Sequence, residues 1–187
     1  MKKELILALR FTLMTTLVFG LIYPLCMTEL SQLLFPKQAA GSLIEKSGHV
    51  VGSKLIGQSF TSDKYFHSRP SAAGAGYDAS ASSPSNLAPT NQALVDRVKS
   101  DVAKLQQENP GAAIPADLVT SSGSGLDPEI SPAAADFQIP RIAKARGISV
   151  DSLKALVARH TQARTWGIFG EPRVNVLELN LDLDSLK

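Results

Sequence analysis

Cysteine and histidine are scarce in this chain of 187 residues, and their scarcity excludes two kinds of stabilising site. The one cysteine, Cys26, lies in or at the edge of an apolar run, so the rest of the chain has to fold without a disulfide. The three histidines, His49, His67 and His160, are scattered and do not have the spacing of metal ligands. The sequence therefore predicts no metal site.

An excess of charge of one sign is also missing. The chain has 19 basic and 17 acidic residues, and three of the basic and two of the acidic residues precede Phe35, which leaves 16 against 15. A nucleic-acid surface needs an excess of basic residues, so we expect no nucleic-acid partner. The remaining length of about 150 residues is that of one domain with its own core.

What the sequence does have is a long apolar run near its start. From Leu5 to Met27 the single charged residue is Arg10. At about 1.5 Å per residue, a helix of this length crosses a hydrocarbon core of roughly 30 Å. A cleavable secretory signal is the competing interpretation, but the run exceeds the roughly 7–15 apolar residues of such a signal. We interpret residues 1–34 as a cytoplasmic N-terminus and a single transmembrane anchor.

The basic residues around this run predict its orientation. Lys2, Lys3 and Arg10 crowd the N-terminal flank, and basic residues favour the cytoplasmic side of a membrane. Arg10 lies close enough to the end of the run to extend its side chain back to the headgroups. We therefore expect a single-pass protein of the cell membrane, with residues 35–187 forming an exterior domain.

Small residues recur every four positions along the predicted anchor, at Thr12, Thr16 and Gly20. Such a stripe lets another helix approach closely, although small residues are common in spanning helices and their spacing here can also arise by chance. Pro24, near the outer end, is expected to kink the helix.

Residues 35–187 alternate between strand and helix signals, which predicts an α+β domain. Short strands are expected at Ser42–Ile44, His49–Val51 and Lys54–Ile56, with turns at Ser47-Gly48 and Gly52. Residues 74–89 are rich in Gly, Ala, Ser and Pro and predict a long surface loop, ordered by its contacts. An amphipathic helix follows, capped by Thr90 or Asn91 and ended by Pro110-Gly111.

The last third predicts two helices and a strand. Ser131-Pro132 starts the first helix, which we expect to be broken or kinked at Pro140 and to stop at Gly147. Ser149 caps the second, which runs toward Thr165. Leucines at every second position from Leu177 to Leu183 predict a terminal strand, with a bulge near Val176.

The Ser-Gly segment Ser121–Gly125, ahead of the helix at Ser131, has the composition of an anion-binding cradle. The alternative is a tight turn whose hydroxyl groups bond to the local backbone. A catalytic serine has little support, because Ser122-Gly123-Ser124-Gly125 does not fit Gly-x-Ser-x-Gly and no histidine lies nearby in the sequence. A nucleotide-binding P-loop is excluded by the lack of a lysine after the glycines.

Six blocks, in order along the chain, resemble the C subunit of the bacterial Kdp-type potassium-transporting ATPase. They are GQSF (57–60), YFHSRPSAAG (65–74), SNL (85–87), DLVTSSGSGLDPEIS (117–131), QIPRIAKARG (138–147) and GEPRVNVLELNLDL (170–183). Together with the anchor they cover nearly the whole chain. One departure is the sequence Ser82-Ser83-Pro84-Ser85, where the family usually has a Ser-Gly-Gly-Ser turn.

This resemblance implies a non-catalytic subunit of a potassium uptake complex in the inner membrane. The implied partners are a channel-like potassium-binding subunit, a P-type subunit that hydrolyses ATP, and a small membrane peptide. Potassium and ATP are then handled by the complex, and no cofactor is expected on this chain. A different class of function stays open beside it, namely an independent anchored exterior module that binds or hydrolyses an anionic substrate.

The resemblance also implies a catalytic chaperone that raises the ATP affinity of the pump subunit. Its implied nucleotide contacts are the Ser-Gly loop (Ser122, Gly123, Ser124 and Gly125) and Gln138. An exterior loop cannot touch cytoplasmic ATP, so we expect any such effect to be transmitted through the complex. Tyr65, Phe66, Arg69 and Pro70 form either a docking surface or a half-buried aromatic corner.

Overall fold

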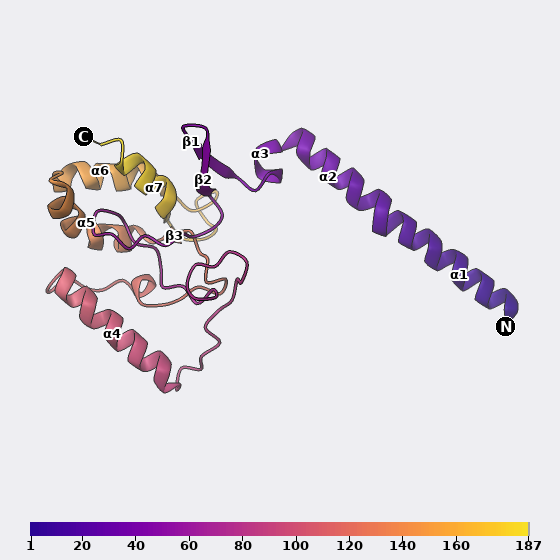
Figure 1. Cartoon of the computed structure of the whole chain (residues 1–187), viewed down its shortest axis with the longest axis horizontal. Helices are drawn as coiled ribbons and strands as arrows, with labels where there is room; N and C mark the ends of the chain where they lie inside the picture. Colours follow the sequence, from indigo (N-terminus) through magenta and orange to yellow (C-terminus); the bar gives the residue numbers. More distant parts are fainter. Residues whose placement is uncertain (187) are drawn as a thin grey trace. The chain divides into compact units, whose positions relative to one another are not determined.

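The computed structural model describes residues 1–186, and they fall into two compact units, Met1–Val51 and Gly52–Lys187. The division comes later in the chain than the end of the long N-terminal helix at Leu34. Each unit combines helices with a small sheet, which confirms the α+β class (Figure 1).

The first unit begins with a helix of 33 residues, Lys2–Leu34, long and apolar enough to cross a membrane. It consists of α1 (Lys2–Leu17), a π-helical turn η1 (Val18–Ile22) and α2 (Tyr23–Leu34). Pro24 has no N–H to donate to the carbonyl of Gly20, and the widened turn lies just before it. The expected disturbance at Pro24 therefore takes the form of a π-helical turn.

After the short helix α3 (Pro36–Ala39), the chain forms a hairpin of β1 (Leu43–Lys46) and β2 (His49–Ser53), and the first unit ends within β2, at Val51. Ser47 and Gly48 have φ values of 55° and 80°, as a two-residue hairpin turn requires. The predicted hairpin is confirmed, but the third strand at Lys54–Ile56 is wrong. Ser53 accepts hydrogen bonds from the N–H groups of Leu55 and Ile56, so the chain turns there instead.

The second unit packs three helices against a three-stranded antiparallel sheet. The helices are α5 (Pro132–Arg146), α6 (Val150–His160) and α7 (Val176–Leu183), and the strand order is β3 (Glu129–Ile130), β5 (Arg173–Asn175), β4 (Thr161–Gln162). Val174 in the central strand pairs with Ile130 on one side and Thr161 on the other. The fully buried core combines Phe66, Ile139, Ile142, Leu153, Leu156, Val174, Val176, Leu179 and Leu183.

Irregular segments separate most of the helix α4 (Gln92–Glu108) from α5, α6 and α7 (Figure 1). Asn91, one of the two predicted caps, starts this helix. Ser131 and Ser149 cap α5 and α6, and Gly147 ends α5 in the left-handed conformation, at φ 69°. Helix α6 stops at His160, however, because Thr161 and Gln162 pair with β5.

The prediction for Pro140 was a break or a kink, and the helix α5 is continuous through this residue, so the break is wrong. Pro140 cannot donate to the carbonyl of Asp136, but both residues are exposed and water can take the place of the missing N–H.

The predicted terminal strand is also wrong, because residues 176–183 form the helix α7. The side chain of Asn175 accepts a hydrogen bond from the N–H of Glu178 and so starts a helix. Val176, Leu179 and Leu183 are all buried, and their spacing of three and four places them on one helical face. A strand would have turned Val176 to the opposite side of the sheet from the other two.

Candidate functional site

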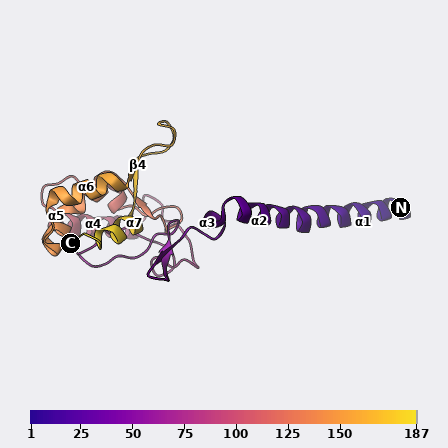
Figure 2. The ribbon, with the colours of Figure 1, turned by 90° about the horizontal axis from the view of Figure 1, so that it is seen from above.

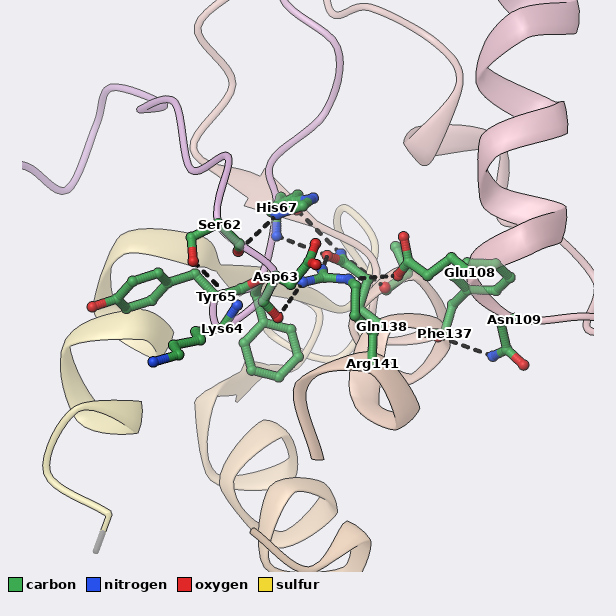
Figure 3. Close-up of polar contacts among 12 residues, drawn as sticks. Ser62, Asp63, Lys64, Tyr65, His67, Glu108, Asn109, Phe137, Gln138 and Arg141 are labelled. Carbon is green, nitrogen blue, oxygen red and sulfur yellow. Dashed lines mark hydrogen bonds and ion pairs between the residues drawn. The ribbon is translucent and has the colours of Figure 1, made fainter. Parts of the chain in front are cut away.

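The segment at 63–69 begins with a turn and passes beside α5 and α7 without belonging to any helix or sheet, and side chains make most of its backbone hydrogen bonds. Asn180 accepts from the N–H of Phe66 and donates to its carbonyl, both at 2.9 Å. Gln138 does the same for His67, accepting at 2.7 Å and donating at 3.1 Å (Figure 3). Two side-chain amides thus replace the strand that would otherwise pair with this segment. We call this arrangement the amide clasp.

All of the hydrogen-bonding capacity of Gln138 is used by its own chain. Its nitrogen also donates to the carbonyl of Ala134 at 3.2 Å, and its oxygen also accepts from the guanidinium of Arg141 at 2.9 Å. A primary amide has two donor hydrogens and two acceptor lone pairs, so these four bonds saturate it. The side chain is only 1% exposed, and its position on the inner face of α5 explains why.

Two arginines of α5 hold the rest of the segment. Arg141 donates to the carbonyls of Asp63 and Tyr65, at 2.6 and 3.0 Å, and pairs with Glu108 of α4 at 2.8 Å (Figure 3). Arg146 donates to the carbonyl of Lys64 at 2.6 Å and lies 4.7 Å from the centre of the Tyr65 ring. The five carbonyls from 63 to 67 therefore all accept from α5 or α7 side chains.

Two titratable groups of this region are shifted by burial. Burial lowers the pKa of His67 below its ordinary value of 6.5, and the nearby guanidinium of Arg141 lowers it further. Burial raises the pKa of Tyr77, whose hydroxyl donates to the carbonyl of Arg69. Both residues are therefore neutral at pH 7.

The four candidate docking residues lie in different environments. Phe66 is fully buried in the core, and Tyr65 is half-buried against Phe60 and Arg146. Arg69 pairs with Asp127 at 2.9 Å, and Pro70 is half-buried. In this structure the group has the form of a half-buried corner, with Phe66 unable to present its ring to a partner.

The Ser-Gly loop is fastened to the preceding long loop. The carbonyl of Ser124 accepts from the N–H of Ser83 at 3.0 Å and from the hydroxyl of Ser82 at 2.9 Å. The carbonyl of Gly125 accepts from the hydroxyl of Ser71, and the hydroxyl of Ser124 accepts from the N–H of Leu126 at 3.1 Å. As expected, the region 74–89 has neither helix nor strand and is ordered by such contacts.

Only one of the two glycines in this loop is required by its geometry. Gly125 has a φ of 67°, and a Cβ atom there would lie 2.6 Å from the carbonyl oxygen of Ser83. Gly123 has no positive φ, and a Cβ atom would meet nothing within 4 Å. The loop does not lead directly into α5, because β3 lies between them. The Ser-Gly loop is hydrogen-bonded to Ser71, Ser82 and Ser83, whereas Gln138 is hydrogen-bonded to His67. Different segments therefore hold the two implied nucleotide contacts.

The residues that sequence reasoning missed are Asn180, Arg141 and Arg146. Asn180 alternates with the leucines of the predicted strand, which would place it on the opposite face from them, whereas it is buried in α7. The available signal was a lone amide within a leucine-rich run, because a buried amide needs a donor for its oxygen and an acceptor for its nitrogen. The two arginines lie in the QIPRIAKARG block, in the C-terminal half of α5, and both reach the segment at 63–65.

Comparison with known proteins agrees with the sequence blocks. The model of the family described as "KdpC: K+-transporting ATPase, c chain" matches residues 5–185. The chain belongs to the KdpC family. Three similar relatives carry the name "Potassium-transporting ATPase KdpC subunit". The protein from Koribacter versatilis is 58% identical over 98% of this chain and 95% of its own length. Those from Rhodopseudomonas palustris (strain BisB18) and Methylobacterium nodulans are 58% and 57% identical over all of this chain, and over 100% and 96% of their own lengths.

Membership of the KdpC family makes this chain an accessory subunit of a potassium-transporting ATPase complex. The apolar helix Lys2–Leu34 fits a single-pass subunit of a membrane-bound pump. The competing interpretation, an independent exterior module, does not agree with this membership.

Proposed function

We propose that this subunit has no active site of its own and supports the pump through assembly and indirect coupling. In this proposal the anchor packs against other spanning helices, and residues 35–187 lie outside the cell. The partners are a channel-like potassium-binding subunit, a P-type ATP-hydrolysing subunit and a small membrane peptide. An increase in the ATP affinity of the pump is then a coupling free energy carried by the complex.

The saturation of Gln138 is the observation that carries this proposal. A residue that contacts nucleotide needs a free donor or acceptor, and all four positions of this amide are taken by Ala134, Arg141 and His67. In the Ser-Gly loop, Ser82 and Ser83 donate to the carbonyl of Ser124 and fasten the loop to its own domain. A direct contact of Gln138 with ATP would require its four bonds to break first.

The charge pattern supports the exterior location. Lys2 and Lys3 precede the apolar helix, and basic residues next to a span favour the cytoplasmic side. With a single crossing, everything beyond the helix then lies on the opposite side. ATP is cytoplasmic, so the domain and the nucleotide are separated by the membrane.

Cysteine labelling tests the location. In a background without Cys26, single cysteines at Ser100 and Ser152, both exposed, should react with a membrane-impermeant thiol reagent in intact cells. A cysteine at Lys3 is the control and should react only after lysis. Labelling of Ser100 and Ser152 only after lysis would place the domain in the cytoplasm and favour direct contact with ATP.

ATP titration tests the coupling. The purified full-length chain should show no saturable ATP binding up to millimolar concentration. Removal of the subunit from the complete complex should weaken the apparent ATP affinity of the pump. Binding of ATP to the isolated chain would contradict indirect coupling.

A further inference from the structure

The segment between β4 and β5 leaves the second unit as a turn that carries large apolar side chains into solvent. Figure 2 shows it extending away from the helices after β4. Trp166 is 86% exposed, Ile168 71% and Phe169 60%. We call residues 164–171 the aromatic tip. Three adjacent side chains of this size and exposure are typical of a protein or membrane contact.

The aromatic tip is built to hold one shape. Thr165 and Phe169 exchange two backbone hydrogen bonds, at 2.8 and 3.0 Å, and Arg164 pairs with Glu171 at the base. The rings of Trp166 and Phe169 meet edge to face, with centroids 6.0 Å apart. Trp166 and Gly167 have φ values of 54° and 77°, as the centre of a two-residue hairpin turn requires. A turn held by these bonds presents its aromatic groups in one arrangement, and such preorganisation lowers the entropic cost of binding.

The surface beside the tip is acidic. A recess of about 640 Å³ begins at Gly170 and Glu171, where the tip ends. Its lining has four carboxylates and two arginines, namely Asp117, Asp127, Glu129, Glu171, Arg69 and Arg173. Arg69 pairs with Asp127, and Arg173 pairs with Glu129. Asp117 accepts hydrogen bonds from Ser131 and forms no ion pair with a described residue. Glu171 pairs with Arg164, so among the described residues the four carboxylates face three arginines, and Asp117 supplies the one carboxylate in excess.

We infer that the aromatic tip and the acidic recess together dock onto another subunit of the pump, one that presents an apolar pocket next to a lysine or arginine. This inference rests on the proposed function, because it needs a partner on the same side of the membrane. The tip supplies the aromatic anchors of such an interface, and the recess supplies the complementary charge. An anionic lipid surface fits less well, since Arg69, Arg164 and Arg173 beside the tip are each already paired with a carboxylate.

Photo-crosslinking in the assembled complex tests this contact. A benzophenone amino acid replaces Trp166 in the full-length chain, and membranes are irradiated before purification. We expect a covalent adduct between this chain and one other pump subunit. The control position is Val150, also apolar and 41% exposed but at the start of α6, where we expect no adduct. Crosslinks to lipid alone, equal crosslinking at both positions, or no crosslink at Trp166 would overturn the inference.

Substitution provides a second readout. The triple variant Trp166→Ser, Ile168→Ser, Phe169→Ser should bind the rest of the pump at least about tenfold more weakly, as removal of interface aromatics generally does. Glu171→Gln removes a carboxylate whose side chain is 76% exposed, and it should weaken the association at low salt only. The melting temperature of the isolated full-length chain should stay unchanged in both variants, because exposed ion pairs contribute little to stability, which separates docking from folding.

The failure of this inference differs from the failure of the proposed function. If the wild-type chain co-purifies with the pump and the triple variant does so equally well, only the docking surface is wrong. If the wild-type chain does not associate with a pump at all, the proposed function is wrong as well.

Discussion

The amide clasp gives the sharpest prediction, because Gln138 and Asn180 do the same structural work and only Gln138 is an implied nucleotide contact. We compare Gln138→Ala with Asn180→Ala in the full-length chain. Each substitution removes both hydrogen-bond partners of one backbone residue, His67 or Phe66. If Gln138 has a structural role, the two variants should behave alike.

The expected loss follows from the groups left without partners. A buried backbone N–H or carbonyl that loses its hydrogen bond costs about 1–3 kcal/mol, and Gln138→Ala orphans one of each. Water reaches part of His67, which is half-buried, so we expect about 2–4 kcal/mol rather than the upper limit. Phe66 is fully buried, so Asn180→Ala should cost at least as much. At roughly 2–4 °C for each kcal/mol, the melting temperature should fall by about 5–15 °C.

Thermal unfolding of the purified chains, followed by circular dichroism, measures these shifts. The assembled complexes are then compared for their apparent ATP affinity at a temperature where all chains are folded. Both variants should lower the yield of complex, and any change in ATP affinity should occur in both. A normal melting temperature for Gln138→Ala, with a change in ATP affinity that Asn180→Ala lacks, would refute the structural role and support a nucleotide contact.

Three further predictions concern the Ser-Gly loop, His67 and the anchor. Gly125→Val should destabilise the domain by about 2 kcal/mol or more, because its Cβ atom would clash with the backbone, whereas Gly123→Val should be tolerated. Thermal unfolding of both variants measures the difference. Because the pKa of His67 is lowered in the folded chain, the unfolded chain binds more protons near and below pH 6.5, and the free energy of unfolding should decrease as the pH falls from 6.5 toward the folded pKa. His67→Gln should make the melting temperature depend less on pH in thermal melts between about pH 7.5 and 5. Gly20→Ile should reduce co-purification with the other subunits, because its side is open to another helix, whereas Val18→Ile should not.

Each of these three predictions has a contradicting outcome. Equal losses for the two valine variants would show that the loop geometry is not the cause. An unchanged pH slope in His67→Gln would assign the titration to another group. Normal assembly of Gly20→Ile would mean that the small-residue stripe is accidental and that the anchor only tethers the domain.

The features that the sequence predicted correctly are those that depend on neighbouring residues. Asn91, Ser131 and Ser149 each precede a helix whose N–H groups need an acceptor, and a short side chain next in sequence supplies it. Gly147 likewise ends α5 because a glycine adopts the left-handed conformation at little cost. Such signals are local, so they can be recognised without knowledge of the tertiary structure.

The features that the sequence predicted wrongly depend on distant contacts. Leucines at every second position from Leu177 fit a strand, but Val176, Leu179 and Leu183 fit a helix equally well. The cap at Asn175 is a local signal for the helix that the leucine alternation outweighed. The burial of Asn180 depends on hydrogen bonds with Phe66, 114 residues away in the chain, and no local pattern contains that information.

The same contacts change what the family resemblance means for the candidate site. Three of its blocks, YFHSRPSAAG, QIPRIAKARG and GEPRVNVLELNLDL, meet in the amide clasp, where Phe66 and His67 bond to Asn180 and Gln138. Residues that recur in blocks invite a ligand-binding interpretation, and Gln138 is the example here. An extended segment without a neighbouring strand has the same need for specific residues, because each of its buried backbone groups requires a partner. The amides and arginines of these blocks meet that need, so the fold of residues 52–186 explains the blocks before any nucleotide is invoked.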